Sequence, residues 1–261
     1  MDLELTGKTA IVTGASKGIG LAVTKALASE GAHVVAGSRT LTAELETLIP
    51  GGTVTFVPCD LATPEGPNAL VAAATDLGGV DILVNNAGSA TPRVAGFASV
   101  TDDDWLATLT INLLSAVRTT RVTLPHMQRQ GGGSVVTVSS VNAFLPDPSV
   151  IDYCASKAAL TNFCKALSKE VAQQNIRINT VSPGPVSTGL WMGEHGVATV
   201  VANVSGTTPK DVTDAAAAGS ETGRFTLPEE VADLVLFLAS DRAGNITGSD
   251  FVIDGGLIKT L

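Results

Sequence analysis

The sequence predicts an α/β fold in which a parallel sheet of about seven strands carries helices on both faces. Short runs rich in valine and isoleucine alternate with longer segments in which leucine, valine and alanine recur at helical spacing. The short runs are apolar throughout, as expected of strands that are buried on both faces. Elements in this alternation form right-handed βαβ units, whose strands are parallel.

The expected elements can be assigned in chain order. The strands are residues 9–13, 33–36, 54–57, 82–84, 134–138, 176–181 and 251–253. The helices are residues 20–30, 64–77, 102–127, 153–173 and 228–239. This order matches a Rossmann-type doubly wound sheet, in which ligands bind at the carboxyl ends of the strands.

The length of 261 residues is within the range of one α/β domain, so we expect residues 1–261 to form a single domain. The strand–helix rhythm is interrupted only over residues 185–225, where glycine, serine, threonine, valine and alanine prevail. We expect this segment to be a partly helical flap that covers substrate at the carboxyl edge of the sheet. An ordinary surface insertion is the alternative.

Composition excludes several classes of partner. The net charge of −9 gives no overall attraction to nucleic acid or to an anionic membrane. Three cysteines in a chain of this length favour reduced thiols over a disulfide framework. The acidic start lacks the pattern of a signal peptide, and no apolar stretch approaches the ~20 residues of a membrane span. We therefore expect a cytoplasmic protein with no nucleic-acid or membrane partner.

A glycine-rich turn joins the first expected strand directly to the first helix. Residues 13–20 read Thr-Gly-Ala-Ser-Lys-Gly-Ile-Gly, and glycines there let the backbone approach a pyrophosphate at the positive end of a helix. A purely structural glycine turn is the alternative. The candidate binding residues of the turn are Gly14, Ser16, Lys17, Gly18, Ile19 and Gly20.

The end of the second strand bears on the choice of nicotinamide cofactor. An acidic residue at this position holds a ribose 2′-hydroxyl, whereas basic residues accommodate a 2′-phosphate. Here the strand is followed by Ser38 and Arg39, with no acid, and Lys17 is expected nearby. This combination favours NADP(H) over NAD(H). Alternatively, Lys17 and Arg39 are solvated surface residues.

Tyr153 and Lys157 are four residues apart in an expected helix, so their side chains share one face. A cation beside a phenol lowers the phenol pKa and makes it a usable general acid or base. By spacing alone the pair is unremarkable, but Tyr153 is the only tyrosine in the chain.

Five motifs occur together over nearly the whole chain. They are Thr13-Gly14-x-x-x-Gly18-x-Gly20, Asn85-Asn86-Ala87-Gly88, Ser139-Ser140, Tyr153-x-x-x-Lys157 and Pro183-Gly184. In this order and spacing the sequence resembles the short-chain dehydrogenase/reductase family in its shorter form. The resemblance implies an NADP-dependent oxidoreductase, a ketoreductase or alcohol dehydrogenase acting on CH–OH groups.

The resemblance also implies roles for four catalytic residues. Tyr153 would exchange a proton with the substrate oxygen while hydride moves to or from the nicotinamide, and Lys157 would hold the nicotinamide ribose and lower the tyrosine pKa. Ser140 would polarise the carbonyl. Asn112 would kink its helix and help a water link Lys157 to solvent. Ser139 is instead interpreted as a strand-end hydroxyl without a catalytic task.

Further residues would contact the cofactor. Those implied on the adenine and ribose side are Asp60, Leu61, Asn86, Ala87 and Gly88, and those implied over the nicotinamide are Pro183, Gly184, Val186 and Thr188. Asp60 could equally cap the next helix, and Cys154 is interpreted as buried packing. Neither the three histidines nor the cysteines show metal-ligand spacing, so we expect no metal.

The substrate site is expected to be apolar. Its candidate residues are Ser140, Val141, Phe144, Leu190 and Trp191. They favour hydrophobic ketones or alcohols. A 3-oxoacyl substrate on a carrier protein stays open, although residues 172–175 lack a basic residue for the carrier and only Arg129 could serve.

Two other functions and an oligomer complete the expectations. The main alternative is a catalytically silent protein that senses NADP(H), although relatives of that kind typically lose the tyrosine or the lysine. An epimerase or dehydratase is disfavoured by the glycine spacing and the lack of a large C-terminal domain. The family commonly forms tetramers, and the apolar face around Leu160 suits a homotetramer or dimer, unless that face only covers the sheet.

Overall fold

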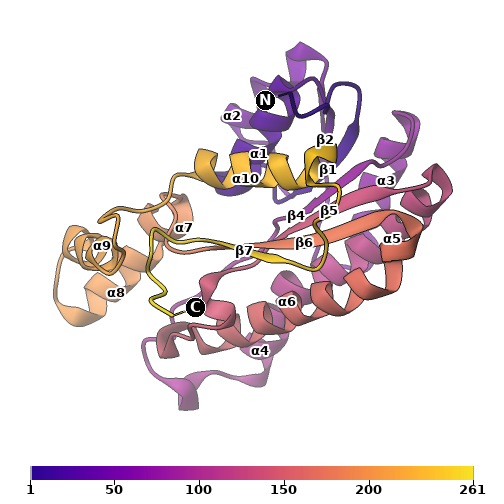
Figure 1. The fold of residues 1–261 in the computed structure, drawn as a ribbon. Coiled ribbons are helices and arrows are strands. Elements are labelled where there is room, and N and C mark those ends of the chain that lie inside the picture. The colour runs from indigo at the N-terminus through magenta and orange to yellow at the C-terminus, as the bar shows by residue number, and fades with distance from the viewer. Residues whose placement is uncertain (1, 261) are drawn as a thin grey trace.

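The computed structural model describes residues 2–260 and contains one parallel sheet of seven strands in the order β3-β2-β1-β4-β5-β6-β7 (Figure 1). The strands are β1 (Thr9–Thr13), β2 (His33–Ser38), β3 (Val54–Pro58), β4 (Ile82–Asn85), β5 (Gly133–Val138), β6 (Ile176–Pro183) and β7 (Asp250–Ile253). All seven strands were predicted, and the largest errors, at the ends of β2 and β6, are two residues.

Helices cover both faces of this sheet (Figure 1). They are α1 (Gly18–Ser29), α2 (Ala43–Glu46), α3 (Gly66–Asp76), α4 (Asp102–Leu109), α5 (Ser115–Gln130), α6 (Ile151–Val171), α7 (Gly189–Met192), α8 (Val197–Ser205), α9 (Pro209–Ala218) and α10 (Pro228–Ala239). The predicted doubly wound fold is therefore confirmed.

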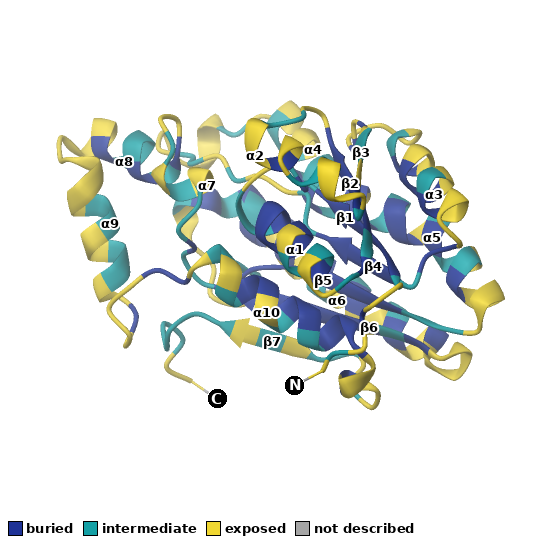
Figure 2. Ribbon diagram, turned by 90° about the horizontal axis from the view of Figure 1, so that it is seen from above, coloured by how far each residue is buried: buried dark blue, intermediate teal, exposed yellow. Residues whose placement is uncertain are grey.

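Each strand supplies alternate side chains to two separate cores. In β1, Val12 packs with α1 and α10 on one face, whereas its neighbour Ile11 packs with α3, α5 and α6 on the other. Both side chains are fully buried. This explains why the strand sequences are apolar without alternation, and Figure 2 shows the buried strands enclosed by helices whose outer faces are exposed.

The carboxyl ends of the strands meet at one edge of the sheet. The strand order reverses beside β1, which pairs with β2 on one side and with β4 on the other. The loops after β1 and β4 therefore diverge to opposite faces and leave an opening between them, the usual ligand position in such sheets. The glycine-rich turn and the Asn86–Gly88 segment both start at this point.

The single helix predicted over residues 102–127 is wrong. A π-helical turn, Thr110–Leu114, separates α4 from α5. Within it the buried Asn112 side chain donates hydrogen bonds to the Ser89 carbonyl (2.8 Å) and the Thr108 carbonyl (3.1 Å). This π-helical turn directs the Asn112 side chain towards the loop after β4. The helix is therefore distorted at Asn112, as predicted.

Residues 185–225 are partly helical, as predicted, and contain α7, α8 and α9. The segment returns to the main body through a bridge between Val186 and Thr226. Near this point Trp191 packs edge-on against Phe225, with ring centroids 5.2 Å apart. The flap thus starts and ends at one place, beside the carboxyl ends of β6 and β7.

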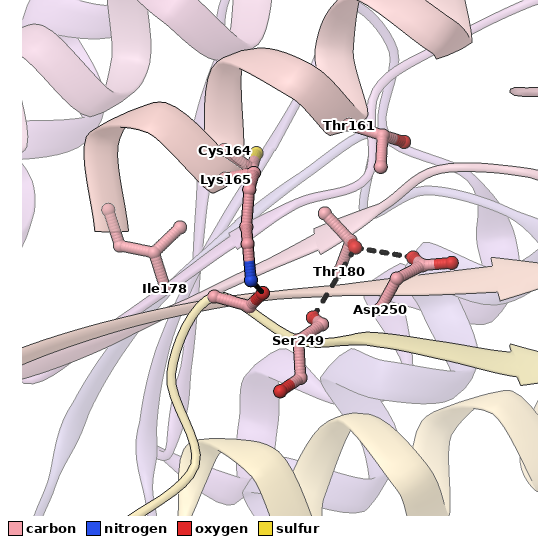
Figure 3. A pocket seen from close by; sticks show the side chains of 8 residues that line it. Thr161, Cys164, Lys165, Ile178, Thr180, Ser249 and Asp250 are labelled. Atoms are coloured by element: carbon pink, nitrogen blue, oxygen red, sulfur yellow. Dashed lines mark hydrogen bonds between the residues drawn. The ribbon is translucent and has the colours of Figure 1, made fainter. Parts of the chain in front are cut away.

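The edge strand β7 is fastened to the sheet by polar groups around a pocket beside α6 (Figure 3). The Asp250 carboxylate accepts hydrogen bonds from Thr180 and from Ser182 (2.8 Å). Lys165 of α6 donates to the Gly248 carbonyl at 2.5 Å. These hydrogen bonds attach β7 to the sheet and to α6, and Tyr153 and Lys157 do not line the pocket.

The α6 face proposed for oligomer contacts divides into two parts. Leu160 is buried in the core beneath α6, and Phe163 and Leu167 pack against that core. Ala158 and Ala159 are exposed. Leu160 therefore covers the sheet, whereas the two alanines are accessible to another subunit and Phe163 and Leu167 are partly accessible.

Candidate active site

The glycine-rich turn is shaped by its own backbone. Gly14 and Gly18 have φ of 65° and 54°, which disfavours larger residues. A Cβ on Gly20 would lie 2.2 Å from the Gly14 carbonyl oxygen. Only glycine at position 20 lets α1 start this close to β1, which exposes the first N–H groups of α1 at the strand ends.

Hydrogen bonds join the glycine-rich turn to the turn after β4 beneath the start of α1. The Thr13 hydroxyl accepts hydrogen bonds from the backbone N–H groups of Asn86 (2.9 Å) and Ala87 (3.0 Å). The Asn86 amide donates back to the Thr13 carbonyl at 3.0 Å. Among the described residues, no side chain caps the start of α1 and no acid lies in its first turn. These features fit the phosphates of a dinucleotide.

The end of β2 is rich in donors and has no carboxylate. Ser38 is buried and donates its hydroxyl to the Thr40 carbonyl (2.8 Å). Arg39 and Lys17 are exposed, and neither forms an ion pair with any residue in the range 2–260. Two free cations and a hydroxyl fit a ribose 2′-phosphate better than a 2′-hydroxyl.

Tyr153 and Lys157 occupy the first two turns of α6, which begins two residues earlier than predicted. The Lys157 Nζ lies 5.7 Å from the centroid of the Tyr153 ring and donates to the Val138 carbonyl at 2.8 Å. A Cβ on Gly88 would lie 3.6 Å from Lys157 Nζ and 2.7 Å from Asn112 Oδ1. The fold thus brings together Tyr153, Lys157, Asn112 and the Asn86–Gly88 turn.

The two serines after β5 have different surroundings. Ser139 shares a hydrogen bond of 2.6 Å with Thr161 and is buried within the fold. Ser140 precedes a short turn, Val141–Ala143. Its hydroxyl forms a hydrogen bond with the Tyr153 phenol that lowers the pKa of Tyr153. Of the two, Ser140 is therefore the one beside the phenol, in agreement with the preference for it in the sequence.

Loss of water is the main influence on the pKa values of Tyr153 and Lys157. It raises the pKa of Tyr153 to about 12, and the Ser140 hydroxyl opposes this rise. Burial also lowers the pKa of Lys157 to about 8. Loss of water around the phenol is thus the main cause of this rise in the protein alone. The lowering of the tyrosine pKa expected from Lys157 stays a prediction.

Asp60 and Cys154 have structural partners. The Asp60 carboxylate accepts from the Ala62 N–H at 2.9 Å and closes a turn ahead of α3, whose first helical residue is Gly66. Asp60 is therefore not the helix cap, and Leu61 beside it is buried. Cys154 is buried against Asp147, as its interpretation as packing predicted.

The candidate substrate residues lie on two segments. Val141 is buried, whereas Phe144 and Leu190 are exposed to 47% and 41%. Trp191 is engaged with Phe225 inside the flap. Thr188 lies above the glycine-rich turn, where a Cβ on Gly18 would be 3.2 Å from its methyl group. Pro183, Gly184 and Val186 lead from β6 into the flap and continue this wall.

Sequence reasoning missed three polar residues around this site. Asn142 gives its N–H to the Ser140 Oγ (3.2 Å) and accepts from the same hydroxyl (3.3 Å). Asp152 and Arg93 form an ion pair at the start of α6. The position of Asp152 next to the sole tyrosine was a usable signal, whereas nothing near Arg93 in the sequence indicates burial.

Residues 2–260 contain neither a metal-binding cluster nor a membrane-spanning helix. No cluster of three or more histidine, cysteine or acidic side chains could hold a metal ion. No helix in this range is both long enough and apolar enough to cross a membrane.

Known proteins match this architecture. The family described as enoyl-(acyl carrier protein) reductase matches residues 14–258. Dehydrogenase/reductase SDR family member 4 of Homo sapiens is 37% identical, over 97% of this chain and 88% of its own. The chain belongs to the short-chain dehydrogenase/reductase family. The 3-oxoacyl-(acyl-carrier-protein) reductase of Thermotoga maritima is 35% identical, over 98% of this chain and 100% of its own.

A solved structure of this short-chain dehydrogenase/reductase family is similar over its full length. L-sorbose reductase from Gluconobacter frateurii, complexed with NADPH and L-sorbose, has a TM-score of 0.91 and is 36% identical, with 100% of both chains covered. The family is thus one of dehydrogenases and reductases that act on alcohols or ketones.

We predict that Gly20→Ala weakens NADPH binding at least about 10-fold and lowers the free energy of unfolding. The new Cβ would lie 2.2 Å from the Gly14 carbonyl oxygen, which cannot move away unless the whole turn shifts. Isothermal titration with NADPH and urea unfolding measure the two effects. Gly51→Ala is the matched control, since a Cβ there meets nothing within 4 Å. Unchanged NADPH affinity in Gly20→Ala would contradict the proposed phosphate site.

We predict that Lys157→Met stabilises the cofactor-free protein by about 1–3 kcal/mol at pH 7, since it removes a buried ammonium. The folded lysine loses its proton near pH 8 and the unfolded one near 10.5, so the advantage should decline over this interval and vanish above it. Urea midpoints at several pH values measure it. The exposed Lys169→Met is the control, and a destabilised Lys157→Met at pH 7 would oppose the account.

Proposed function

We propose that this protein is an NADP(H)-dependent oxidoreductase that transfers a hydride between the cofactor and a carbonyl or alcohol substrate. The observation that carries the proposal is the pair of half-buried Tyr153 and buried Lys157, with Ser140 beside the phenol, at the carboxyl edge of the sheet. Residues 1–261 form one domain in this proposal, and residues 185–225 cover the substrate.

Tyr153 is proposed to move the proton and Ser140 to hold the substrate oxygen. In reduction, the phenol gives its proton to the oxygen of the substrate while Ser140 donates a hydrogen bond to that oxygen. NADPH supplies the hydride that adds to the carbonyl carbon. With a pKa of about 12 in the protein alone, Tyr153 is fully protonated at neutral pH and is ready to act as the acid.

Lys157 and Asn112 support this chemistry. A charged Lys157 favours the phenolate that remains after proton transfer, and its ammonium is proposed to hold the nicotinamide ribose. Because burial lowers its pKa to about 8, that charge is lost in mildly alkaline solution. Asn112, which lies with Lys157 around Gly88, provides the polar route by which a water returns the proton.

The preference for NADP(H) is proposed from Arg39, Lys17 and Ser38. Ser38 and Arg39 lie at the end of β2, where an acid would serve NAD(H), and Lys17 adds a second exposed cation from the glycine-rich turn. The similar L-sorbose reductase was solved with NADPH. Asp60 and Leu61 are proposed on the adenine side, with Asn86, Ala87 and Gly88 along the ribose.

The proposed substrate is a ketone, or the matching alcohol, with an apolar part. Phe144, four residues after Ser140, and Leu190 at the start of the flap expose apolar side chains, and the Thermotoga maritima relative acts on 3-oxoacyl chains by its name. Hydroxylated ketones are the second candidate. Asn142 favours them, because its amide nitrogen donates one hydrogen to the Leu145 carbonyl (3.1 Å) and has a second hydrogen for a hydroxyl next to the substrate carbonyl.

A silent NADP(H) sensor is not favoured. The comparisons give it no support, and a sensor has no use for the ionisable groups buried around Tyr153. We further propose a cytoplasmic protein, in keeping with three free, buried cysteines. A homotetramer or dimer through the exposed alanines of α6 is the proposed assembly.

We predict that Tyr153→Phe reduces NADPH-dependent turnover of the best substrate by at least about 10³-fold while NADPH binding changes by less than about 3-fold. The panel comprises simple ketones, 3-oxoacyl esters and ketoses, followed by NADPH absorbance. Tight binding without turnover by the wild type over this panel would support the sensor. Turnover retained in Tyr153→Phe would overturn the proposed acid.

We predict that Arg39→Asp lowers the ratio of kcat/KM for NADPH to that for NADH by about 10²-fold, because an acid repels a 2′-phosphate and accepts a 2′-hydroxyl. Steady-state kinetics with both cofactors measure the ratio. Arg242→Asp is the control, since Arg242 pairs with Glu4 near the N-terminus at 2.7 Å. An unchanged ratio would refute the cofactor assignment but leave the catalytic proposal intact.

A further inference from the structure

A buried carboxylate directly precedes the sole tyrosine. Asp152 is 1% exposed and lies in the first turn of α6. Its Oδ2 atom receives the Arg93 guanidinium at 2.5 Å and the Thr108 hydroxyl at 2.7 Å. Its Oδ1 atom is buried and has no hydrogen-bond partner among the residues that the structure describes. Charged groups are rarely buried in this way without a specific task.

Arg93 connects three elements through this ion pair. It belongs to the loop that runs from the Asn86–Gly88 turn to α4, and its own N–H donates to the Ser149 carbonyl at 2.6 Å, just before α6. A second guanidinium nitrogen meets the Asp104 carboxylate of α4 at 2.9 Å. The arginine side chain is only 13% exposed, so water competes little for these contacts.

Thr108 continues the network to the other side of the site. Its hydroxyl donates to Asp152, and its carbonyl accepts the Asn112 amide at 3.1 Å. Asn112 in turn accepts from the Ser89 N–H at 3.0 Å and donates to the Ser89 carbonyl at 2.8 Å. The loop after β4 is therefore fixed at Ser89 and at Arg93, first to the π-helical turn and then to the start of α6.

We propose that Arg93 and Asp152 are positioning residues, which hold the start of α6 against the loop after β4 and thereby fix the Tyr153 phenol relative to the cofactor side of the site. The inference rests on the proposed role of Tyr153. Stability alone is a poor explanation for the pair, because a buried ion pair with an unpaired oxygen is not more stable than apolar packing. Fixed geometry at a reacting group is worth far more, since small displacements there slow chemistry strongly.

Because Tyr153 is the only tyrosine in the chain, phenolate absorbance reports its surroundings directly. In the wild type, burial holds the pKa of Tyr153 at about 12, so native protein at about pH 10.5 should show little phenolate absorbance. In Arg93→Met, a loosened start of α6 admits water to the phenol, and the phenolate signal should rise toward that of the unfolded chain. We expect kcat to fall about 10-fold or more, with KM for NADPH within about 3-fold of wild type.

Further variants separate positioning from general stability. Arg93→Met leaves the Asp152 charge unpaired and can fail to fold, so Arg93→Met combined with Asp152→Asn removes both charges and should recover much of the urea midpoint. In that double variant kcat stays low and phenolate stays high if the pair positions Tyr153. Arg93→Lys still offers a positive charge to the Asp152 carboxylate, so it should have a higher kcat than Arg93→Met. Arg242→Met, which breaks an exposed ion pair with Glu4, is the control.

Wild-type kcat and wild-type phenolate absorbance in the double variant would overturn the proposal and leave the pair a purely structural one. The phenolate signal does not depend on turnover. If Tyr153→Phe remained active, the proposed function would fail, whereas the effect of Arg93 on the burial of the phenol would still be measured. The two failures are therefore distinguishable.

Discussion

The arrangement of this protein depends on the placement of two ionisable groups, the half-buried Tyr153 and the buried Lys157, at the carboxyl edge of a parallel sheet. Lys157 is 4% exposed, and its ammonium donates to the Val138 carbonyl at the end of β5. A lysine in this position disfavours folding, and burial accordingly lowers its pKa to about 8. The fold tolerates it because the strands on either side are fully buried and fixed by two cores. The stability that the cores supply is what allows a costly charge beside the phenol.

The surrounding loops are fixed to the same place by polar contacts. Thr13 and Asn86 join the glycine-rich turn to the turn after β4, and Asn112 joins that turn to the distorted helix. Arg93 and Asp152 close the opposite side at the start of α6. Loops from β1, β4 and β5 thus meet around Tyr153 with little freedom to move independently. An open α/β sheet supplies the convergence of the loops, and these side chains supply the fixed geometry.

The sequence predicted the fold class and the strands well, because buried parallel strands have a strong apolar signal and α10 has clear helical spacing. It failed over residues 102–127, where helical spacing continues through Thr110–Leu114 although the backbone widens there to seat Asn112. Local pattern cannot report such a turn, since its cause is a contact with Ser89, 23 residues away. The fold brings the catalytic motif residues together, whereas Arg93 was missed because its partner Asp152 is 59 residues away in the sequence. Asn142 was missed although its contact with Ser140 is local. Spacing on a helix likewise indicates the lysine near Tyr153 but not the loss of water that raises the pKa of Tyr153 in the protein alone.

The central claim is that the phenol of Tyr153 lies where a nicotinamide would make it acidic. The most direct test is a spectrophotometric titration of the sole tyrosine with and without NADP⁺, with Tyr153→Phe as the blank. The positive charge of an oxidised nicotinamide beside the phenol stabilises phenolate. The account therefore predicts that saturating NADP⁺ moves the appearance of phenolate to lower pH by at least about one unit. Identical titrations with and without bound NADP⁺ would contradict it, because Tyr153 would then lie too far from the reacting ring to exchange a proton with substrate.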